Sequence, residues 1–209
     1  MTTMTTQHRP FTPLSRILHW TMAVLILTML FIGIGMVVSL SHYETLISIH
    51  RPLGILILAL VAIRLVNRLL NPPPPLPAWM PAWQRFAAIG SHVLLYALMF
   101  AVPLVGWAML SAAGYPITLY GPWQLPPIAP RSPELFAALR TTHTVLALLL
   151  FATFLVHLAA ALMHALIYRD WVFPSMTLEA LGRGEEPPSR TTGTDRRVPT
   201  ARERAESGH

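Results

Sequence analysis

The sequence predicts an all-α integral membrane protein built as a four-transmembrane-helix bundle. Of its 209 residues 54% are hydrophobic and only 11% are charged, and the apolar residues gather in four long runs. A helix needs about 20 apolar residues to cross the hydrocarbon core of a bilayer. Backbone groups in lipid must be satisfied within their own segment, so these runs are expected to be helices.

Each run is long enough for one span, and we place the spans at residues 15–40, 48–69, 87–111 and 141–168. Pro103 lies inside the third span and predicts a kink there. The proline-rich segment Asn71–Pro81 cannot continue a helix and predicts an extended connector. The stretch Gly114–Pro133 is punctuated by proline and glycine and predicts an ordered loop or a re-entrant cap.

Three regions follow from this pattern. Residues 1–14 form a short N-terminal segment, 15–176 the membrane domain and 177–209 a polar tail. The first apolar run is longer than a signal-peptide core and lacks a small-residue cleavage site, so we expect it to be retained as a span. The tail cannot bury enough apolar surface to fold, and we expect it to be disordered.

The basic residues indicate the orientation of the chain in the membrane. The net charge of +6 is the difference between 15 basic residues, all of them arginine, and nine acidic residues, and almost all of the arginines lie outside the apolar runs or at their ends. This distribution is typical of topology signals and argues against a nucleic-acid partner. One side of the predicted bundle carries Arg9, Arg16, Arg64, Arg68, Arg85 and Arg169, and the other carries Arg51, Arg131 and Arg140. The excess predicts a multi-pass protein with both termini in the cytoplasm.

The chain contains no cysteine. Disulfides, thiolate-bound iron–sulfur clusters and the covalent attachment of a c-type haem are therefore excluded. Any haem would be held without a covalent bond.

Histidines are the most informative polar residues of the predicted spans. Polar side chains within a membrane are costly and usually functional. Residues 143 and 157 of the fourth span are 14 positions apart, which corresponds to about 21 Å of helical rise and to directions within about 40° of each other. This spacing suits two b-type haems stacked across a bilayer. Six of the nine histidines lie in or at the ends of spans: His19, His50, His92, His143, His157 and His164.

An iron with two axial imidazoles needs a second histidine at the same depth on another helix. His50 matches His143 in depth, whereas either His19 or His92 could pair with His157. Two other interpretations compete with haem ligation: histidines that only hydrogen-bond between helices, and a zinc or iron site, for which the spans offer no acidic partner. The arginines beside these histidines, Arg16, Arg51 and Arg140, fit either haem propionates or ordinary interfacial anchoring.

Short motifs then point to a family. They are LHW at Leu18–Trp20, IHRPLG at Ile49–Gly54, GSH at Gly90–His92, GYP and LPPIAP in the long loop, and THT and HLAAALMH in the last span. Together they resemble the bacterial cytochrome b561 family over about residues 10–176. The resemblance implies a protein of the bacterial cytoplasmic (inner) membrane with two haem b groups that exchanges electrons with ubiquinone.

The same resemblance implies roles for individual residues. His50 and His143 would bind the extracytoplasmic haem iron, and His19 and His157 the cytoplasmic one. The candidates for contacts with a haem propionate or a quinone are Arg16, His92 and His164.

One member of that family is a superoxide oxidase, which passes electrons from superoxide to ubiquinone. By analogy a small-molecule donor would be attracted by a positive outer patch of Arg51, Arg131 and Arg140. The alternative is an anchor subunit that links a partner dehydrogenase or hydrogenase to the quinone pool. The expected partners are thus membrane lipids, quinone and a small electron donor, or else a redox partner subunit.

Overall fold

The computed structural model describes residues 11–73, 80–120, 122–169 and 176. Within these ranges four helices are long and apolar enough to cross a membrane. They are α1 (Pro13–Val38), α2 (Tyr43–Leu70), α3 (Ala82–Ala113) and α4 (Pro133–Met163), and a π-helical turn, η2 (His164–Tyr168), extends α4. A 3-10 turn, η1 (Leu40–His42), joins α1 to α2. The predicted fold class is confirmed.

Two of the helices begin with the same local signal. Thr12 caps α1 by accepting a hydrogen bond from the backbone N–H of Ser15 at 3.3 Å, and Ser132 caps α4 by accepting one from Leu135 at 3.1 Å. In each case a proline follows at the first helical position, where its missing N–H costs nothing. This cap starts α4 at Pro133, eight residues before the predicted span.

The loop between α3 and α4 contains a short antiparallel hairpin, β1 (Ile117–Tyr120) and β2 (Trp123–Leu125). Gly114 ends α3 with a φ of 75°, a left-handed conformation that glycine adopts readily. Three hydrogen bonds tie the rest of the loop to α3: Trp107 Nε1 to Pro126 O, Ile128 N to Ser111 Oγ, and Ser132 N to Ala112 O. The expected ordered cap is therefore a hairpin, which contacts α2 through β1.

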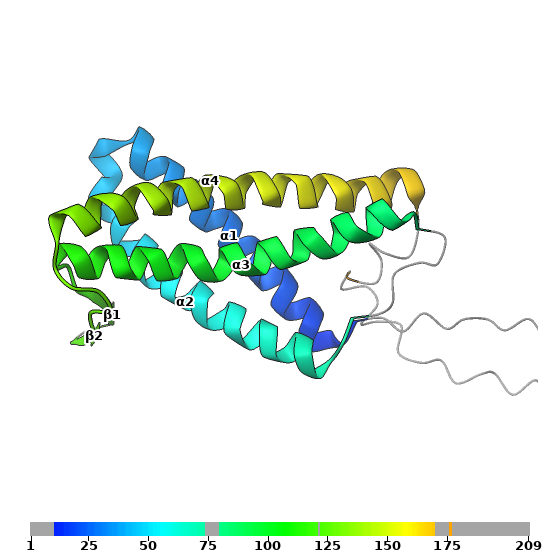
Figure 1. The fold of residues 1–209 in the computed structure, drawn as a ribbon, viewed down its shortest axis with the longest axis horizontal. Helices are drawn as coiled ribbons and strands as arrows, with labels where there is room; N and C mark the ends of the chain where they lie inside the picture. The colour runs from blue at the N-terminus through cyan, green and yellow to red at the C-terminus, as the bar shows by residue number, and fades with distance from the viewer. Residues whose placement is uncertain (1–10, 74–79, 121, 170–175, 177–209) are drawn as a thin grey trace, which may run out of the picture.

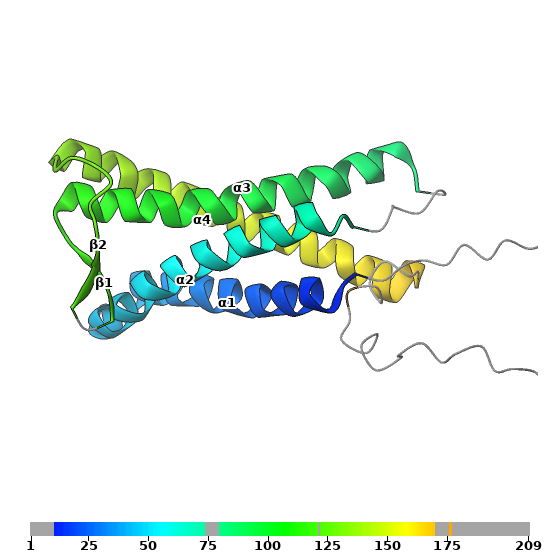
Figure 2. The same ribbon diagram turned by 90° about the horizontal axis from the view of Figure 1, so that it is seen from below.

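The helices pack as two pairs, α1 with α2 and α3 with α4, and α2 also contacts α3. Figures 1 and 2 show the two pairs crossing at an angle. The core between them is apolar and consists of Met22, Ile26, Ile57, Val61, Leu98, Met99 and Leu150. Pro103 lies inside α3, which continues through it.

The bundle has two distinct ends. The end where α1 and α3 begin and α2 and α4 finish is called the terminal end, and the opposite end, which carries β1 and β2, is called the hairpin end (Figure 1). Three predicted regions lie wholly or mostly outside the described residues. They are the proline-rich connector, of which 74–79 is not described, the N-terminal segment, of which 1–10 is not described, and the tail at 177–209.

Candidate functional site

Histidines bridge the two helix pairs at two levels of the bundle. The backbone of α4 scarcely approaches α1 or α2, so large side chains span the distance between the pairs. At the hairpin end the rings of His50 on α2 and His143 on α4 face each other, with centroids 6.2 Å apart and planes inclined by 71°. These are the two residues whose predicted depths matched.

At the terminal end the ring of His157 on α4 has two histidine neighbours. The centroid of His19 on α1 lies 6.4 Å from it, and that of His92 on α3 lies 5.4 Å from it. The structure therefore brings both candidate partners to His157, and distance does not choose between them.

Hydrogen bonds define which ring nitrogen is protonated. Nδ1 of His143 donates to the carbonyl oxygen of Val102 at 3.1 Å, and Nδ1 of His92 donates to that of Ala88 at 2.7 Å. A carbonyl only accepts, so in the neutral ring Nε2 keeps its lone pair. That is the form in which a histidine binds a metal, with its other nitrogen held by an acceptor.

His19 makes the opposite kind of contact. Its Nδ1 accepts a hydrogen bond of 2.8 Å from Nη2 of Arg64, because a guanidinium has donors only. Nε of the same arginine donates to the hydroxyl of Tyr96 at 3.1 Å. From the sequence, Arg64 was predicted only to mark the orientation of the chain, and this contact was not predicted. A basic residue within an apolar run was the signal that could have singled it out.

Three observations agree with ligation of b-type haem by these histidines. Metal–imidazole bonds of about 2 Å place two rings on one iron with centroids on the order of 6 Å apart, close to the separations found here. Among the described residues, the buried Nδ1 of His50 and Nε of Arg51 lack hydrogen-bond partners, as expected beside a site for a polar group. A Cβ at Gly106 would lie 3.1 Å from Cε1 of His143, so this glycine makes room for the ring.

The three arginines predicted to attract a donor all belong to the hairpin end. Arg51 follows His50 on α2, the Arg131 side chain lies against Gly114, and Arg140 is exposed on α4. No hydrogen bond or ring contact joins the three within the described ranges. They share one end of the bundle without forming a contact cluster.

The remaining predicted residues lie near the terminal end. Arg16 is buried, and its Nε donates to the carbonyl oxygen of Phe11 at 2.9 Å. His164 begins the π-helical turn η2, and its ring lies 5.2 Å from that of Tyr168. Single π-helical turns in α-helices occur often at functional sites.

Comparison with known proteins identifies the family. A sequence model of the prokaryotic cytochrome b561 family matches residues 10–178. The chain belongs to this family. As a prokaryotic cytochrome b561, it is a multi-pass bacterial membrane protein, and membership implies electron transfer with b-type haem.

Three curated proteins are similar to this cytochrome b561. Cytochrome b561 homolog 2 of Escherichia coli is 35% identical over 118 residues, which are 54% of this chain and 62% of the relative. Cytochrome b561 homolog 1 of the same organism is 32% identical over 135 residues, 62% of this chain and 73% of the relative. Probable superoxide oxidase CybB of Yersinia pestis is 28% identical over 165 residues, 78% of this chain and 93% of the relative. The chain thus spans less than two thirds of the first of these proteins.

Proposed function

We propose that this cytochrome b561 holds two haem b groups and transfers electrons from an extracytoplasmic donor, superoxide, to ubiquinone. The observation that carries the proposal is the presence of two histidine layers in one bundle, at the hairpin end and at the terminal end. With its terminal end on the cytoplasmic side, as the arginine distribution indicates, the protein would offer one redox site near each membrane face.

His50 and His143 would hold the haem at the hairpin end, and His157 with His19 the haem at the terminal end. The choice of His19 over His92 rests on the family resemblance. Haem iron, which cycles between two oxidation states, supplies the one-electron chemistry. The protein positions the imidazoles, excludes water through its apolar core and sets the electrostatic surroundings.

Superoxide as the donor is supported by the name of the Yersinia pestis relative and by the arginines of the hairpin end. In the overall reaction two superoxide anions each lose one electron and become dioxygen, while one ubiquinone takes up two electrons and two protons and becomes ubiquinol. Arg51, Arg131 and Arg140 would raise the local concentration of the anion. The described part of the hairpin end carries two carboxylates, Glu44 and Glu134, so its arginines outnumber its acids.

Ubiquinone reduction needs protons, which we assign to the terminal end. His92 and His164 lie there, and an imidazole is the side chain best suited to proton transfer near neutral pH. His164, which begins the π-helical turn, would donate a proton to the quinone. His92, beside His157, would serve either as a proton donor or as a ligand.

The test begins with the haem content of the detergent-purified chain, measured from the pyridine haemochrome spectrum. Two b-type haems per chain are expected. A pulse of superoxide should then reduce them, and added ubiquinone should reoxidise them. Protein that binds two haems but is not reduced by superoxide, and that purifies with a soluble dehydrogenase or hydrogenase, would replace the superoxide proposal by the anchor-subunit alternative.

A further inference from the structure

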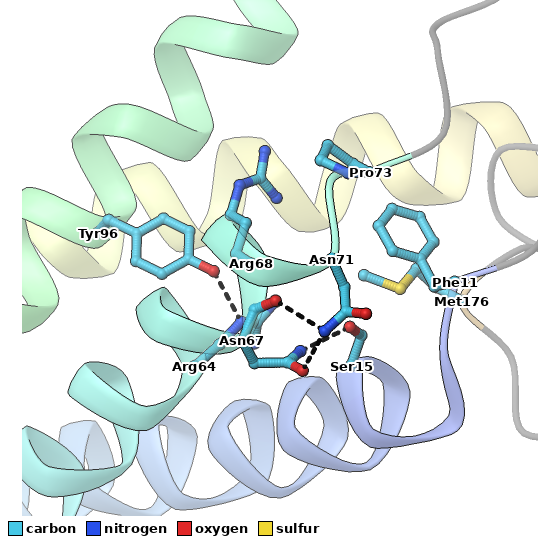
Figure 3. A pocket seen from close by; sticks show the side chains of 9 residues that line it. All are labelled: Phe11, Ser15, Arg64, Asn67, Arg68, Asn71, Pro73, Tyr96 and Met176. Carbon is cyan, nitrogen blue, oxygen red and sulfur yellow. Dashed lines mark hydrogen bonds between the residues drawn. The ribbon is translucent and has the colours of Figure 1, made fainter.

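A small polar cavity lies at the terminal end, between the first turns of α1, the last turns of α2 and the middle of α3 (Figure 3). Its polar lining consists of Ser15, Arg64, Asn67, Arg68, Asn71 and Tyr96. None of the six was assigned a binding role from the sequence. Two of them are arginines one helical turn apart, and both guanidinium groups lie over the ring of Tyr96, at 5.8 Å and 5.7 Å from its centroid.

The two positive charges have no acidic neighbour in the described part of the chain. The carboxylates there are those of Glu44 and Glu134, at the starts of α2 and α4, which belong to the hairpin end. Two half-buried guanidinium groups without a counter-ion are unfavourable at a membrane boundary. The cavity therefore offers a site for an anion.

The amide wall of the cavity is already held in place by its own hydrogen bonds. Nδ2 of Asn67 donates to Oγ of Ser15 at 2.7 Å, and Nδ2 of Asn71 donates to Oδ1 of Asn67 at 3.1 Å. Arg68, by contrast, makes no hydrogen bond within the described residues and lies over the face of Tyr96, so its five N–H donors remain for a ligand. The wall is preorganised and the arginines supply the donors.

The size of the cavity limits the ligand. Its volume of about 20 Å³ exceeds the roughly 10–15 Å³ that one water requires. A single small polar group fits such a space, whereas the ring of a quinone does not. The site is thus suited to the anionic tip of a larger molecule.

Its position relates it to the histidines of the terminal end. Arg64 lines the cavity and also donates to Nδ1 of His19, whose ring lies against His157. We propose that the cavity binds a propionate carboxylate of the haem held at the terminal end, with Arg64 and Arg68 as its donors. This inference rests on the proposed function, because it requires a haem at that position.

The proposal also explains the unusual contact of His19. A carboxylate carries a full negative charge and can accept two parallel N–H bonds from one guanidinium, which a neutral imidazole cannot do. A propionate would therefore draw the donors of Arg64 away from His19. Nδ1 of His19 could then carry the proton, which leaves Nε2 free for iron. Arg64 would act as a positioning residue for the ligand as well as a propionate donor.

The test compares native haem with haem whose propionates are methyl esters, each loaded into protein made in haem-deficient cells. The readout is the rate at which the terminal-end haem passes to excess apomyoglobin, in the unchanged protein and in Arg68→Met. The ester and the substitution should each accelerate release about tenfold, equivalent to about 1.4 kcal/mol. Combined, they should accelerate it little further, because each removes the same contact.

Arg85→Met is the matched control, since Arg85 is an exposed arginine at the same end and is absent from the cavity lining. It should release native haem at the unchanged rate. A redox titration provides a second readout: the midpoint potential of the terminal-end haem should fall in Arg68→Met, because a lost cation favours the oxidised iron, and should stay the same in Arg85→Met. Fully multiplicative effects of ester and Arg68→Met would overturn the proposal.

Two other anions would give different results. If a lipid phosphate occupies the cavity, haem release should respond to anionic lipid in nanodiscs and not to the ester. If a carboxylate of the C-terminal segment occupies it, Asp170→Asn with Glu179→Gln should reproduce the effect of Arg68→Met. Either result would overturn the propionate assignment while two haems remain bound, whereas a purified chain without haem would overturn the proposed function itself.

Discussion

Gly106 on α3 stands directly against the imidazole of His143 on α4. A Cβ at position 106 would lie 3.1 Å from Cε1 and 3.3 Å from Nδ1 of that ring, so the ring would have to move by a few tenths of an ångström. Its Nδ1 also donates a hydrogen bond to the carbonyl oxygen of Val102, one turn earlier on the same helix as Gly106. We therefore expect Gly106→Ala to weaken haem binding at the hairpin end, and to lower the haem content from two towards one per chain.

Gly90→Ala is the matched control for this substitution. Gly90 lies on the same helix, and a Cβ there would meet nothing within 4 Å. Alanine is favoured over glycine in a helix by roughly 0.5–1 kcal/mol, so this variant should keep both haems and be at least as stable. Equal haem content in the two alanine variants would show that the glycine is not needed to place the ring.

Single histidine substitutions should separate the two layers. His50→Ala should remove the haem of the hairpin end alone, because His143 would keep only one protein partner for the iron. His19→Ala and His92→Ala should differ. The variant that lacks the axial ligand should lose the terminal-end haem, whereas the other variant should keep both haems and reduce ubiquinone more slowly. The haem content of each variant and the low-temperature spectrum of its α-band show which of the two haems is lost. Retention of both haems in His50→Ala would contradict the pairing with His143.

The sequence predicted the four spans because membrane thickness constrains helix length whatever the tertiary packing. It also predicted the depth match of His50 and His143, since both positions follow from helical rise. It could not choose between His19 and His92, and the structure shows why: the two helices α1 and α3 bring both rings within 6.4 Å of His157.

Features that depend on contacts between helices were missed. Gly106 and Tyr96 were not singled out within their apolar run, and their roles appear only once the neighbouring helix is placed. The early start of α4 was missed for a different reason. The apolar run was measured for its fit to the bilayer, whereas the helix begins at the Ser132–Pro133 cap in the polar part of the chain.

Neutralising the arginines of the hairpin end should slow reduction by superoxide. Each of Arg51→Gln, Arg131→Gln and Arg140→Gln should lower the second-order rate a few-fold, because the attraction of an anion depends on the local field. The rate of the unchanged protein should also fall as salt rises. Stopped-flow measurement of haem reduction gives the rates of the variants and the salt dependence of the unchanged protein. Arg85→Gln, at the terminal end, should leave the rate unchanged, and an equal loss in that variant would contradict steering at one end.

Because the chain has no cysteine, single cysteines can report its orientation without a background signal. Gln124 on β2 and Arg85 on α3 are both exposed and lie at opposite ends of the bundle. A membrane-impermeant thiol reagent applied to cells with a permeable outer membrane should label Gln124→Cys and should label Arg85→Cys only after the inner membrane is opened. The reverse pattern would place the hairpin end in the cytoplasm and remove the route for an extracytoplasmic donor.

Asn67 ties α2 to α1 at the terminal end. It is buried, and its Nδ2 donates to Oγ of Ser15 at 2.7 Å, while its Oδ1 accepts from Asn71. Hydrogen bonds between membrane helices average about 0.6 kcal/mol, and loss of a buried partner adds to this, so Asn67→Ala should lower the free energy of unfolding by about 1 kcal/mol.

Unfolding of the detergent-solubilised protein, followed by circular dichroism, measures that loss. Thr142→Ala is the control, because the exposed hydroxyl of Thr142 bonds only to the Ala138 carbonyl of its own helix, and its removal should change the stability little. In a double-mutant cycle with Ser15→Ala, a coupling of about 0.5 kcal/mol or more assigns the effect to the contact between the helices. Additive losses would instead mean that Asn67 stabilises the bundle through α2 alone, most directly through Asn71.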